Sequence, residues 1–288
     1  SHLASELRYK TIFDSSNAIY MAISQSGETA DTLEAIRLIN SRSMKTIALT
    51  NVASSSLVRE TQGFLLMQAG QEIAVASTKA FSAQVANLYW LAHFFAYEKG
   101  IISFSEFEHC ESELLIAAEI LESGIEKYKL EIIQNLAPFY SKFKNFIFLG
   151  RGIGYPFALE VALKLKEITY CFVETHPAGE LKHGAIALID SDVPVFLFSS
   201  LDNVIYTKLV GNAQEVKARK GHLVVVAFEG QDELIQLADK AFILPRVNLL
   251  LEPLAMTGLM QFFAYQVAKE LGRSIDKPRN LAKSVTVE

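Results

Sequence analysis

Hydroxyl-bearing side chains gather at one predicted strand-to-helix turn near the start of the chain. The turn follows the apolar run 18–23 and carries four polar side chains that can donate hydrogen bonds: Ser24, Gln25, Ser26 and Thr29. Where a parallel strand ends and a helix begins, free backbone N–H groups and the helix dipole favour an anion. Gly27 lets the backbone approach closely, and the lack of a lysine separates the turn from the lysine-bearing nucleotide loop. The pattern predicts a monophosphate site, and its alternative is an ordinary helix N-cap with Glu28 in the first turn.

Two further groups of charged residues lie in the second half of the chain. Lys164 and Glu167 are spaced i, i+3 on a predicted helix, a pattern that by itself favours a surface ion pair. The segment 177–184 combines two glycines, a carboxylate, a lysine and His183, which is typical of a functional loop, although a lone histidine is more often structural. His183 is a candidate acid or base near neutral pH. No Ser-His-Asp elbow and no metal-ligand spacing of His and Cys is present, so neither a hydrolase nor a metal site is indicated.

The glycine turn 150–154 invites comparison with the dinucleotide-binding fingerprint. The third small residue of that fingerprint falls on Tyr155, and no acidic residue convincingly follows the next strand. No nicotinamide, flavin or other cofactor is therefore expected.

Composition narrows the function classes. The chain has 288 residues, half of them apolar and 20% charged, which suits a soluble globular protein of two domains. A net charge of -5 argues against a nucleic-acid surface. No run reaches the roughly 18 apolar residues of a membrane span, and no signal segment opens the chain. Cys110 and Cys171 are expected to be buried free thiols in a reducing compartment, which favours a cytoplasmic location.

Apolar runs alternate with amphipathic stretches, the pattern of βαβ units around parallel sheets, so the expected fold class is α/β. Strands are predicted at 18–23, 45–50, 64–67, 145–149, 171–174, 193–199, 223–228 and 242–244. Helices are predicted around 33–39 and at 78–97, 155–168, 203–220 and 253–271. The stretch 103–136 indicates a connecting helix pair, and the pattern of the tail alone indicates a disordered terminus.

The two halves resemble copies of one unit. Strand, serine-rich turn, helix and strand recur in 18–50 and 193–228, and Phe-Phe-Ala-Tyr occurs near the end of both long helices, at 94–97 and 262–265. The second copy opens with a strand, a glycine turn and a helix over 145–168. The first copy has no counterpart before Ala18, so it is expected to be incomplete.

Five segments, in order along nearly the whole chain, resemble the glucosamine-6-phosphate synthase family, the glutamine:fructose-6-phosphate amidotransferases: Ser24–Thr29, Ala76–Phe81, Leu163–Glu167, Gly179–Gly184 and Pro278–Glu288. The first segment alone would indicate only a sugar isomerase (SIS) domain. The resemblance implies two SIS-type doubly wound domains with parallel sheets flanked by helices, plus a C-terminal tail. The expected boundaries are 1–102 for a first SIS domain without its opening strand and Ser/Thr loop, 103–272 for connecting helices and the second SIS domain, and 273–288 for an active-site tail.

The resemblance implies conversion of fructose 6-phosphate and ammonia to glucosamine 6-phosphate, with a proton moved between C1 and C2. The family's phosphate contacts match Ser24, Gln25, Ser26 and Thr29, and its sugar contacts match Val75, Ser77 and Ala282. Its catalytic groups match four residues: Glu167 as the base, His183 as the ring-opening group, Lys283 as a Schiff-base lysine, and Lys164 in a role left open. A carboxylate, an imidazole and an amine suit these three steps.

The resemblance also implies partners. It predicts a homodimer in which His183 acts across subunits, and a glutaminase domain in the full-length enzyme, whose catalytic N-terminal Cys has no match here. The expected ligands are fructose 6-phosphate, glucosamine 6-phosphate and glucose 6-phosphate. Two alternatives stay open: a double-SIS sugar-phosphate deaminase or deglycase, and a non-catalytic sugar-phosphate sensor. A pure sensor would need the serine turn, but not Glu167, His183 and Lys283 together.

Overall fold

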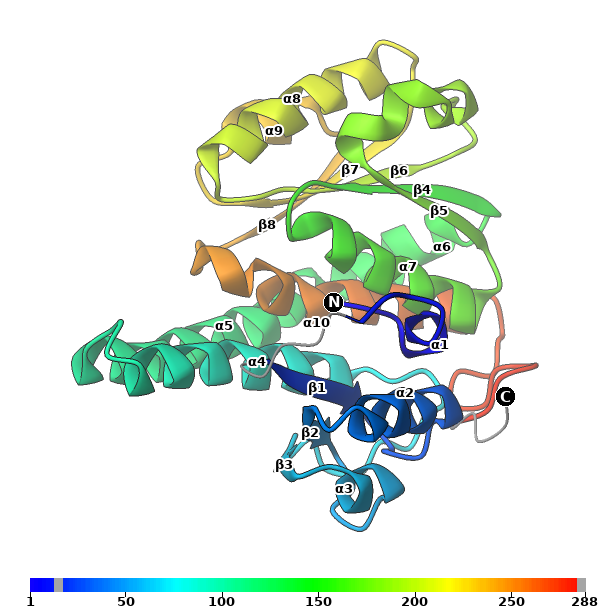
Figure 1. Ribbon diagram of the computed structural model, residues 1–288. Helices are drawn as coiled ribbons and strands as arrows, with labels where there is room; N and C mark the ends of the chain where they lie inside the picture. Colours follow the sequence, from blue (N-terminus) through cyan, green and yellow to red (C-terminus); the bar gives the residue numbers. More distant parts are fainter. Residues whose placement is uncertain (13–17, 284–288) are drawn as a thin grey trace. The chain divides into compact units, whose positions relative to one another are not determined.

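The computed structural model describes residues 1–12 and 18–283 (Figure 1). The chain forms two compact units. The first unit contains the described residues of Ser1–Leu88 and Asn280–Glu288, and the second is Tyr89–Arg279. Each unit has its own parallel sheet flanked by helices, which confirms the predicted α/β class.

The first unit contains a three-stranded parallel sheet in the order β1-β2-β3. Its strands are β1 (Ile19–Ser24), β2 (Lys45–Thr50) and β3 (Gly63–Leu66). Ser24 pairs with Thr50 and Thr50 with Leu66, so the loops that follow the three strands leave the same edge of the sheet. This carboxyl edge is where open parallel sheets bind their ligands.

Helices cover this small sheet: α1 (Ala4–Leu7), α2 (Ala30–Ser41), α3 (Ser56–Glu60) and the start of α4 (Lys79–Glu98). Leu33 and Ile36 lie one turn apart on α2 and are buried against Ala22, Ala48 and Leu57. This apolar stripe is the signal from which α2 was predicted. The short helices α1 and α3 were not predicted, because four or five residues are too few to show a helical period.

The second unit contains a five-stranded parallel sheet in the order β5-β4-β6-β7-β8. Its strands are β4 (Asn145–Gly150), β5 (Phe172–Pro177), β6 (Val195–Phe198), β7 (Leu223–Phe228) and β8 (Lys240–Leu244). In chain order this is the 2-1-3-4-5 arrangement of doubly wound sheets. β5 is placed on one side of β4, and β6, β7 and β8 are placed on the other side. The switch point therefore lies between the carboxyl ends of β4 and β6.

Both faces of the second sheet are buried at its centre, which explains why β6 and β7 are continuous apolar runs. One face packs aliphatic side chains against α8 (Asn203–Lys217), α9 (Asp232–Leu237) and the 3₁₀ segment η2 (Ala178–His183). The other face packs aromatic rings against α7 (Gly154–Thr169) and α10 (Glu252–Glu270): Phe198 lies 5.1 Å from Phe157 and Phe196 lies 5.3 Å from Phe263, centroid to centroid. Figure 1 shows α8 and α9 on one side of the sheet, with α7 and α10 on the other.

One long helix replaces the connecting pair predicted over 103–136. α5 (Phe104–Glu131) begins at a capping box formed by Ser103 and Glu106, and runs through a π-helical turn, η1 (Ile132–Leu136), into α6 (Ala137–Tyr140). The prediction of two helices was wrong because no turn interrupts the stretch. Gly124 lies inside the helix, where an added Cβ would come within 2.9 Å of Leu244 Cδ2, so this glycine serves packing.

The predicted internal repeat is confirmed. β1-α2-β2-α3-β3 and β6-α8-β7-α9-β8 have the same element order and the same parallel neighbours, and α4 and α10 follow them at corresponding places. β4, α7 and β5 have no counterpart among the described residues of the first unit. The remaining short elements, η3 (Ala185–Leu188) and η4 (Leu249–Leu251), are 3₁₀ turns of the second unit.

Both cysteines are free thiols. Cys110 is buried as predicted, whereas Cys171 is only partly buried, and its thiol lies 3.6 Å from the carbonyl oxygen of Phe143. Within residues 1–12 and 18–283, no helix is both long enough and apolar enough to cross a membrane.

Candidate active site

The serine turn, residues 24–29, connects β1 to α2 at the carboxyl edge of the first sheet. Ser24 Oγ accepts a hydrogen bond from the Gly27 amide at 3.1 Å, and Ser26 Oγ accepts one from the Glu28 amide at 3.2 Å. A hydroxyl that accepts from the backbone still carries its own proton to donate. The turn therefore presents hydroxyl donors whose oxygens are already fixed by the main chain.

Gly27 and Glu28 determine the shape of this turn. Gly27 has φ +67°, and a Cβ there would lie 2.3 Å from Ser55 Oγ, so no other residue fits. The Glu28 carboxylate accepts from the Ser56 amide at 2.7 Å, which lowers the pKa of Glu28. Glu28 precedes α2 and caps α3 instead, so the alternative that places it in the first turn of an ordinary capped helix is wrong.

In α8, the helix of the second unit that corresponds to α2, a side chain of the protein itself caps the N-terminus. Asp202 caps α8 by accepting from two of its first amides, at 2.8 and 2.9 Å. Glu252 accepts from the Ser200 hydroxyl at 3.2 Å and from the Leu201 amide, and its burial raises its pKa to about 7. In α2 the N-cap residue Thr29 makes no side-chain cap, although its Oγ1 lies 3.4 Å from Ser24 Oγ. The N-terminus of α2 therefore stays open to an external anion.

Lys283 lies against the loop that follows β3. Its Nζ donates to the carbonyl oxygen of Ala74 at 2.6 Å and to Ser77 Oγ at 3.2 Å. Glu72 holds the same loop to the start of α4 by accepting from the Ala80 amide at 3.0 Å. These residues all belong to the first unit, so the structure brings Lys283 and Ser77 together at the sheet edge that carries the serine turn.

The other residues predicted for this edge make fewer contacts. The Gln25 carbonyl accepts from the Asn51 amide at 3.1 Å, which ties the loops after β1 and β2 together. Val75 lies in the Lys283-bound loop, and Ala282 is exposed next to that lysine. The last residues of the predicted tail motif, 284–288, lie outside the described residues.

On α7 of the second unit, Lys164 lies between two carboxylates. Its Nζ is 2.8 Å from Glu167 Oε2 and 3.6 Å from Glu160 Oε1. The Lys164 side chain is 7% exposed and each carboxylate side chain 19%, so the expected surface ion pair is in fact buried. Burial raises the pKa of Glu160. Sequence reasoning missed Glu160, although the spacing 160, 164, 167 places all three side chains on one helix face.

His183 and the root of the tail lie elsewhere on the second unit. His183 ends η2 with an exposed side chain, and Gly184 follows at φ 151°. Tyr170 Oη accepts from the Arg279 amide at 2.9 Å, and its ring lies 4.3 Å from the guanidinium of Arg279 and 5.1 Å from that of Arg273. The disordered terminus that the pattern indicated is therefore wrong for residues 273–283, which make specific contacts.

No group of three or more His, Cys, Asp or Glu side chains in the described part of the chain could hold a metal ion. The groups that can do chemistry are hydroxyls, two lysines, a carboxylate pair and a histidine. Hydroxyls can bind an anion, lysine amines can condense with a carbonyl, and carboxylates and imidazoles can transfer protons.

The SIS-domain model matches residues 1–94 and 139–270, one segment in each half of the chain. The chain belongs to the SIS-domain family, and both the doubly wound fold and its internal repeat agree with that assignment. Within this family, the chain is 42% identical over 286 residues to the glutamine–fructose-6-phosphate aminotransferase (isomerizing) of Thermus thermophilus, covering 99% of this chain and 47% of the relative. The Clostridium tetani relative of the same name is 43% identical, with 99% and 46% covered. The chain thus spans about half the length of the curated relatives it matches.

Solved structures agree with these relatives. The C-terminal domain of glucosamine-fructose-6-phosphate aminotransferase from Francisella tularensis superposes with a TM-score of 0.89 at 36% identity, covering 96% of this chain and 78% of that one. Glucosamine-6-phosphate deaminase from Thermotoga maritima gives a TM-score of 0.70 at 25% identity, covering 98% and 80%. The family resemblance that the five motifs indicated is therefore confirmed.

Proposed function

We propose that this chain is the isomerising part of a glutamine–fructose-6-phosphate aminotransferase, which makes glucosamine 6-phosphate from fructose 6-phosphate and ammonia. The observation that carries the proposal is the position of the Lys283 amine. It reaches Ser77 at the same edge of the first sheet as the open, hydroxyl-lined N-terminus of α2. An amine next to an anion site suits condensation with the carbonyl of an open-chain sugar phosphate.

In the proposed chemistry, the serine turn holds the phosphate and Val75, Ser77 and Ala282 contact the sugar. His183 of the partner subunit in a homodimer opens the sugar ring, and Lys283 forms an imine with the C2 carbonyl and releases water. Ammonia then replaces the lysine at C2. Glu167 takes a proton from C1, and the enolamine takes that proton back at C2, so C1 becomes the aldehyde of glucosamine 6-phosphate.

Binding of the phosphate is remote from the reacting carbons, so its free energy serves to position them. Lys164 Nζ lies 2.8 Å from Glu167 Oε2, so the lysine fixes the position of the proposed base. A deaminase or deglycase would use similar groups in the reverse direction. The aminotransferase is favoured because relatives of that name are 42–43% identical, against 25% for the deaminase structure.

The test compares the chain with its Glu167→Gln variant, using calorimetry for fructose 6-phosphate binding and a coupled assay for hexosamine phosphate formed from free ammonia. Binding should persist, and turnover should fall by about 10²–10⁴ because the proton carrier is lost. Lys166→Gln, an exposed neighbour on the same helix, is the matched control. Undiminished turnover in Glu167→Gln would exclude the proposed role, and binding without any turnover by the unaltered chain would favour a sensor.

A further inference from the structure

A pocket lies at the switch point of the second sheet, within the second unit, and none of the residues that line it has a role in the proposed reaction. It has a volume of about 490 Å³, in the range of small-molecule sites. Arg151 and Gly152 follow β4, Gly179 follows β5, and Lys208 lies on the helix that follows β6. Ligands of doubly wound sheets bind at this position, outside the carboxyl ends of the strands.

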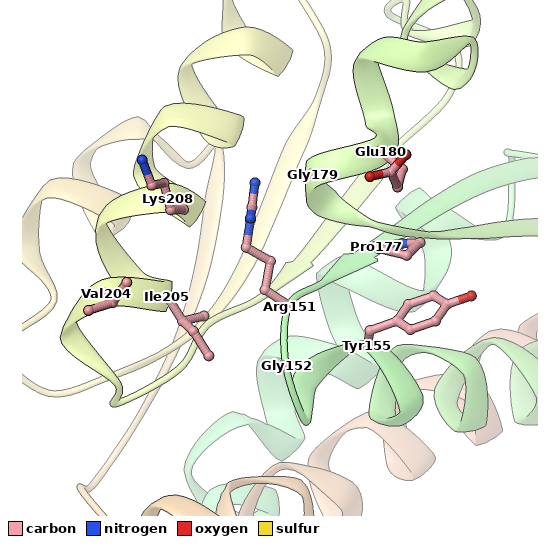
Figure 2. A pocket seen from close by; sticks show the side chains of 9 residues that line it. All are labelled: Arg151, Gly152, Tyr155, Pro177, Gly179, Glu180, Val204, Ile205 and Lys208. Carbon is pink, nitrogen blue, oxygen red and sulfur yellow. The ribbon is translucent and has the colours of Figure 1, made fainter.

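Arg151 is held in place at the centre of this pocket. Its Nε donates to Asn212 Oδ1 at 3.0 Å, and the buried Asn212 in turn donates to Glu215 at 3.1 Å. Figure 2 shows the side chain of Arg151 rising between α8 and the segment of Gly179 and Glu180. The guanidinium forms no ion pair with any described residue, so its two terminal nitrogens remain for a ligand. An arginine fixed in this way loses little entropy when it binds an oxyanion.

Two glycines make room for this arrangement. A Cβ at Gly179 would lie 3.0 Å from Nη2 of Arg151, so a larger residue there would push the guanidinium aside by a few tenths of an ångström. Gly152 has φ +54°, and a Cβ there would lie 2.8 Å from Ile205 of α8. The glycine turn that does not fit the dinucleotide fingerprint therefore has another use, which is to present Arg151 at the switch point.

The lining chemistry specifies the ligand class. Lys208 is a second cation, exposed on α8, and Val204 and Tyr155 supply apolar surface. Glu180 lies on the opposite wall, where a carboxylate can accept from a hydroxyl. The N-terminus of α8 does not contribute, because Asp202 already caps it. We propose that this pocket binds a phosphate ester whose organic part carries hydroxyl groups, with Arg151 and Lys208 on the phosphate and Glu180 on a hydroxyl.

This proposal does not rest on the function proposed above, because none of its residues has a role in that reaction. The test therefore needs a readout for each site. Selective ¹⁵N-glycine labelling provides one, since the chain has only 15 glycines. Gly152 and Gly179 report on the pocket, and Gly27 reports on the serine turn. The probes are ribose 5-phosphate, ribose and inorganic phosphate.

Saturable shifts of Gly152 and Gly179 are expected with ribose 5-phosphate and none with ribose. Arg151→Gln and Lys208→Gln should each weaken this binding by roughly tenfold or more, as loss of a charge-assisted contact does. Lys144→Gln, an exposed lysine just before β4 at the opposite edge of the sheet, should change nothing. Glu180→Gln should strengthen the binding of inorganic phosphate, since it removes a repelling charge.

The proposal is overturned if ribose 5-phosphate leaves Gly152 and Gly179 unshifted, whatever Gly27 does. It is also overturned if Lys208→Gln, an exposed position that does not disturb folding, binds as tightly as the unaltered chain. Shifts confined to Gly27 would support the serine turn as the anion site and remove the pocket as a second one.

Discussion

Replacing Lys164 by Met tests whether the α7 cluster is the buried ion pair that the structure shows. The variant keeps the apolar stem and removes the charge, which leaves Glu160 and Glu167 without their shared cation. Breaking a buried pair in this way costs about 3–5 kcal/mol. Both carboxylate side chains are 19% exposed and so remain partly solvated, and we therefore expect a cost at the lower end of that range, about 3 kcal/mol.

The cost should depend on pH in a predictable direction. Lys164 lowers the pKa of Glu160 in the unaltered chain, so without this lysine the burial of Glu160 raises its pKa further above that of the unfolded chain. A carboxyl group with a raised folded-state pKa stabilises the fold below its unfolded pKa, and this stabilisation is lost as the pH rises through the folded value. Glu160 already has a raised pKa because of burial. The deficit of Lys164→Met should therefore be largest near neutral pH and shrink towards about pH 4.

Urea unfolding followed by circular dichroism measures the loss, and hydrogen exchange of α7 peptides assigns it to the second unit. Lys166→Met is the matched control, since Lys166 is exposed on the same helix, and it should change stability by no more than about 0.5 kcal/mol. Adding Glu167→Gln to Lys164→Met should restore part of the loss. Equal costs for the two lysine variants, or a Lys164→Met deficit that stays constant with pH, would refute the buried pair.

Two further predictions concern the second unit. The pKa of Glu252 is raised to about 7, so its stabilising contribution is lost as the pH rises through that value, and Glu252→Gln should abolish this titration. In thermal unfolding, the stability of the variant relative to the unaltered chain should therefore rise between about pH 5 and 8. A difference in stability that does not change with pH would contradict the assignment. Tyr170→Leu should speed proteolysis within 273–283, because Arg273 and Arg279 lose their shared ring; an unchanged cleavage rate would mean that Tyr170 does not hold the tail.

The strands and long helices were readable from sequence because their apolar patterns are local. β2 and β7 were predicted with their observed bounds, and β7 is an uninterrupted apolar run that ends at turn residues. The amphipathic pattern of 103–136 correctly predicted helix, but the stretch was divided into two helices although no turn residue interrupts it. The five-residue α3 is too short to show a helical period.

The residue types of the candidate site could be read from the sequence, but the burial of their side chains could not. The spacing of Lys164 and Glu167 places them on one helix face, but spacing cannot distinguish a surface ion pair from a buried one. In the structure the Lys164 side chain is only 7% exposed. The contact between Lys283 and Ser77 joins positions about 200 residues apart in sequence, and pattern reading of the tail gave no hint of it. Only the family resemblance connected these two positions, because it carries information about tertiary structure that periodicity lacks.

The two copies of the repeat resolve the same problem at a helix N-terminus in different ways. Amides at the end of a parallel strand need an acceptor, and in the second unit Asp202 and Glu252 supply it from within the protein. Burial of Glu252 disfavours its ionised form, and its raised pKa reflects this desolvation cost. In the first unit Glu28 accepts from the first amide of a different helix, α3, and Thr29, the N-cap residue of α2, makes no side-chain cap. An internal carboxylate excludes an external phosphate by charge and by space, so the N-terminus of α2 is the one that suits the proposed phosphate site.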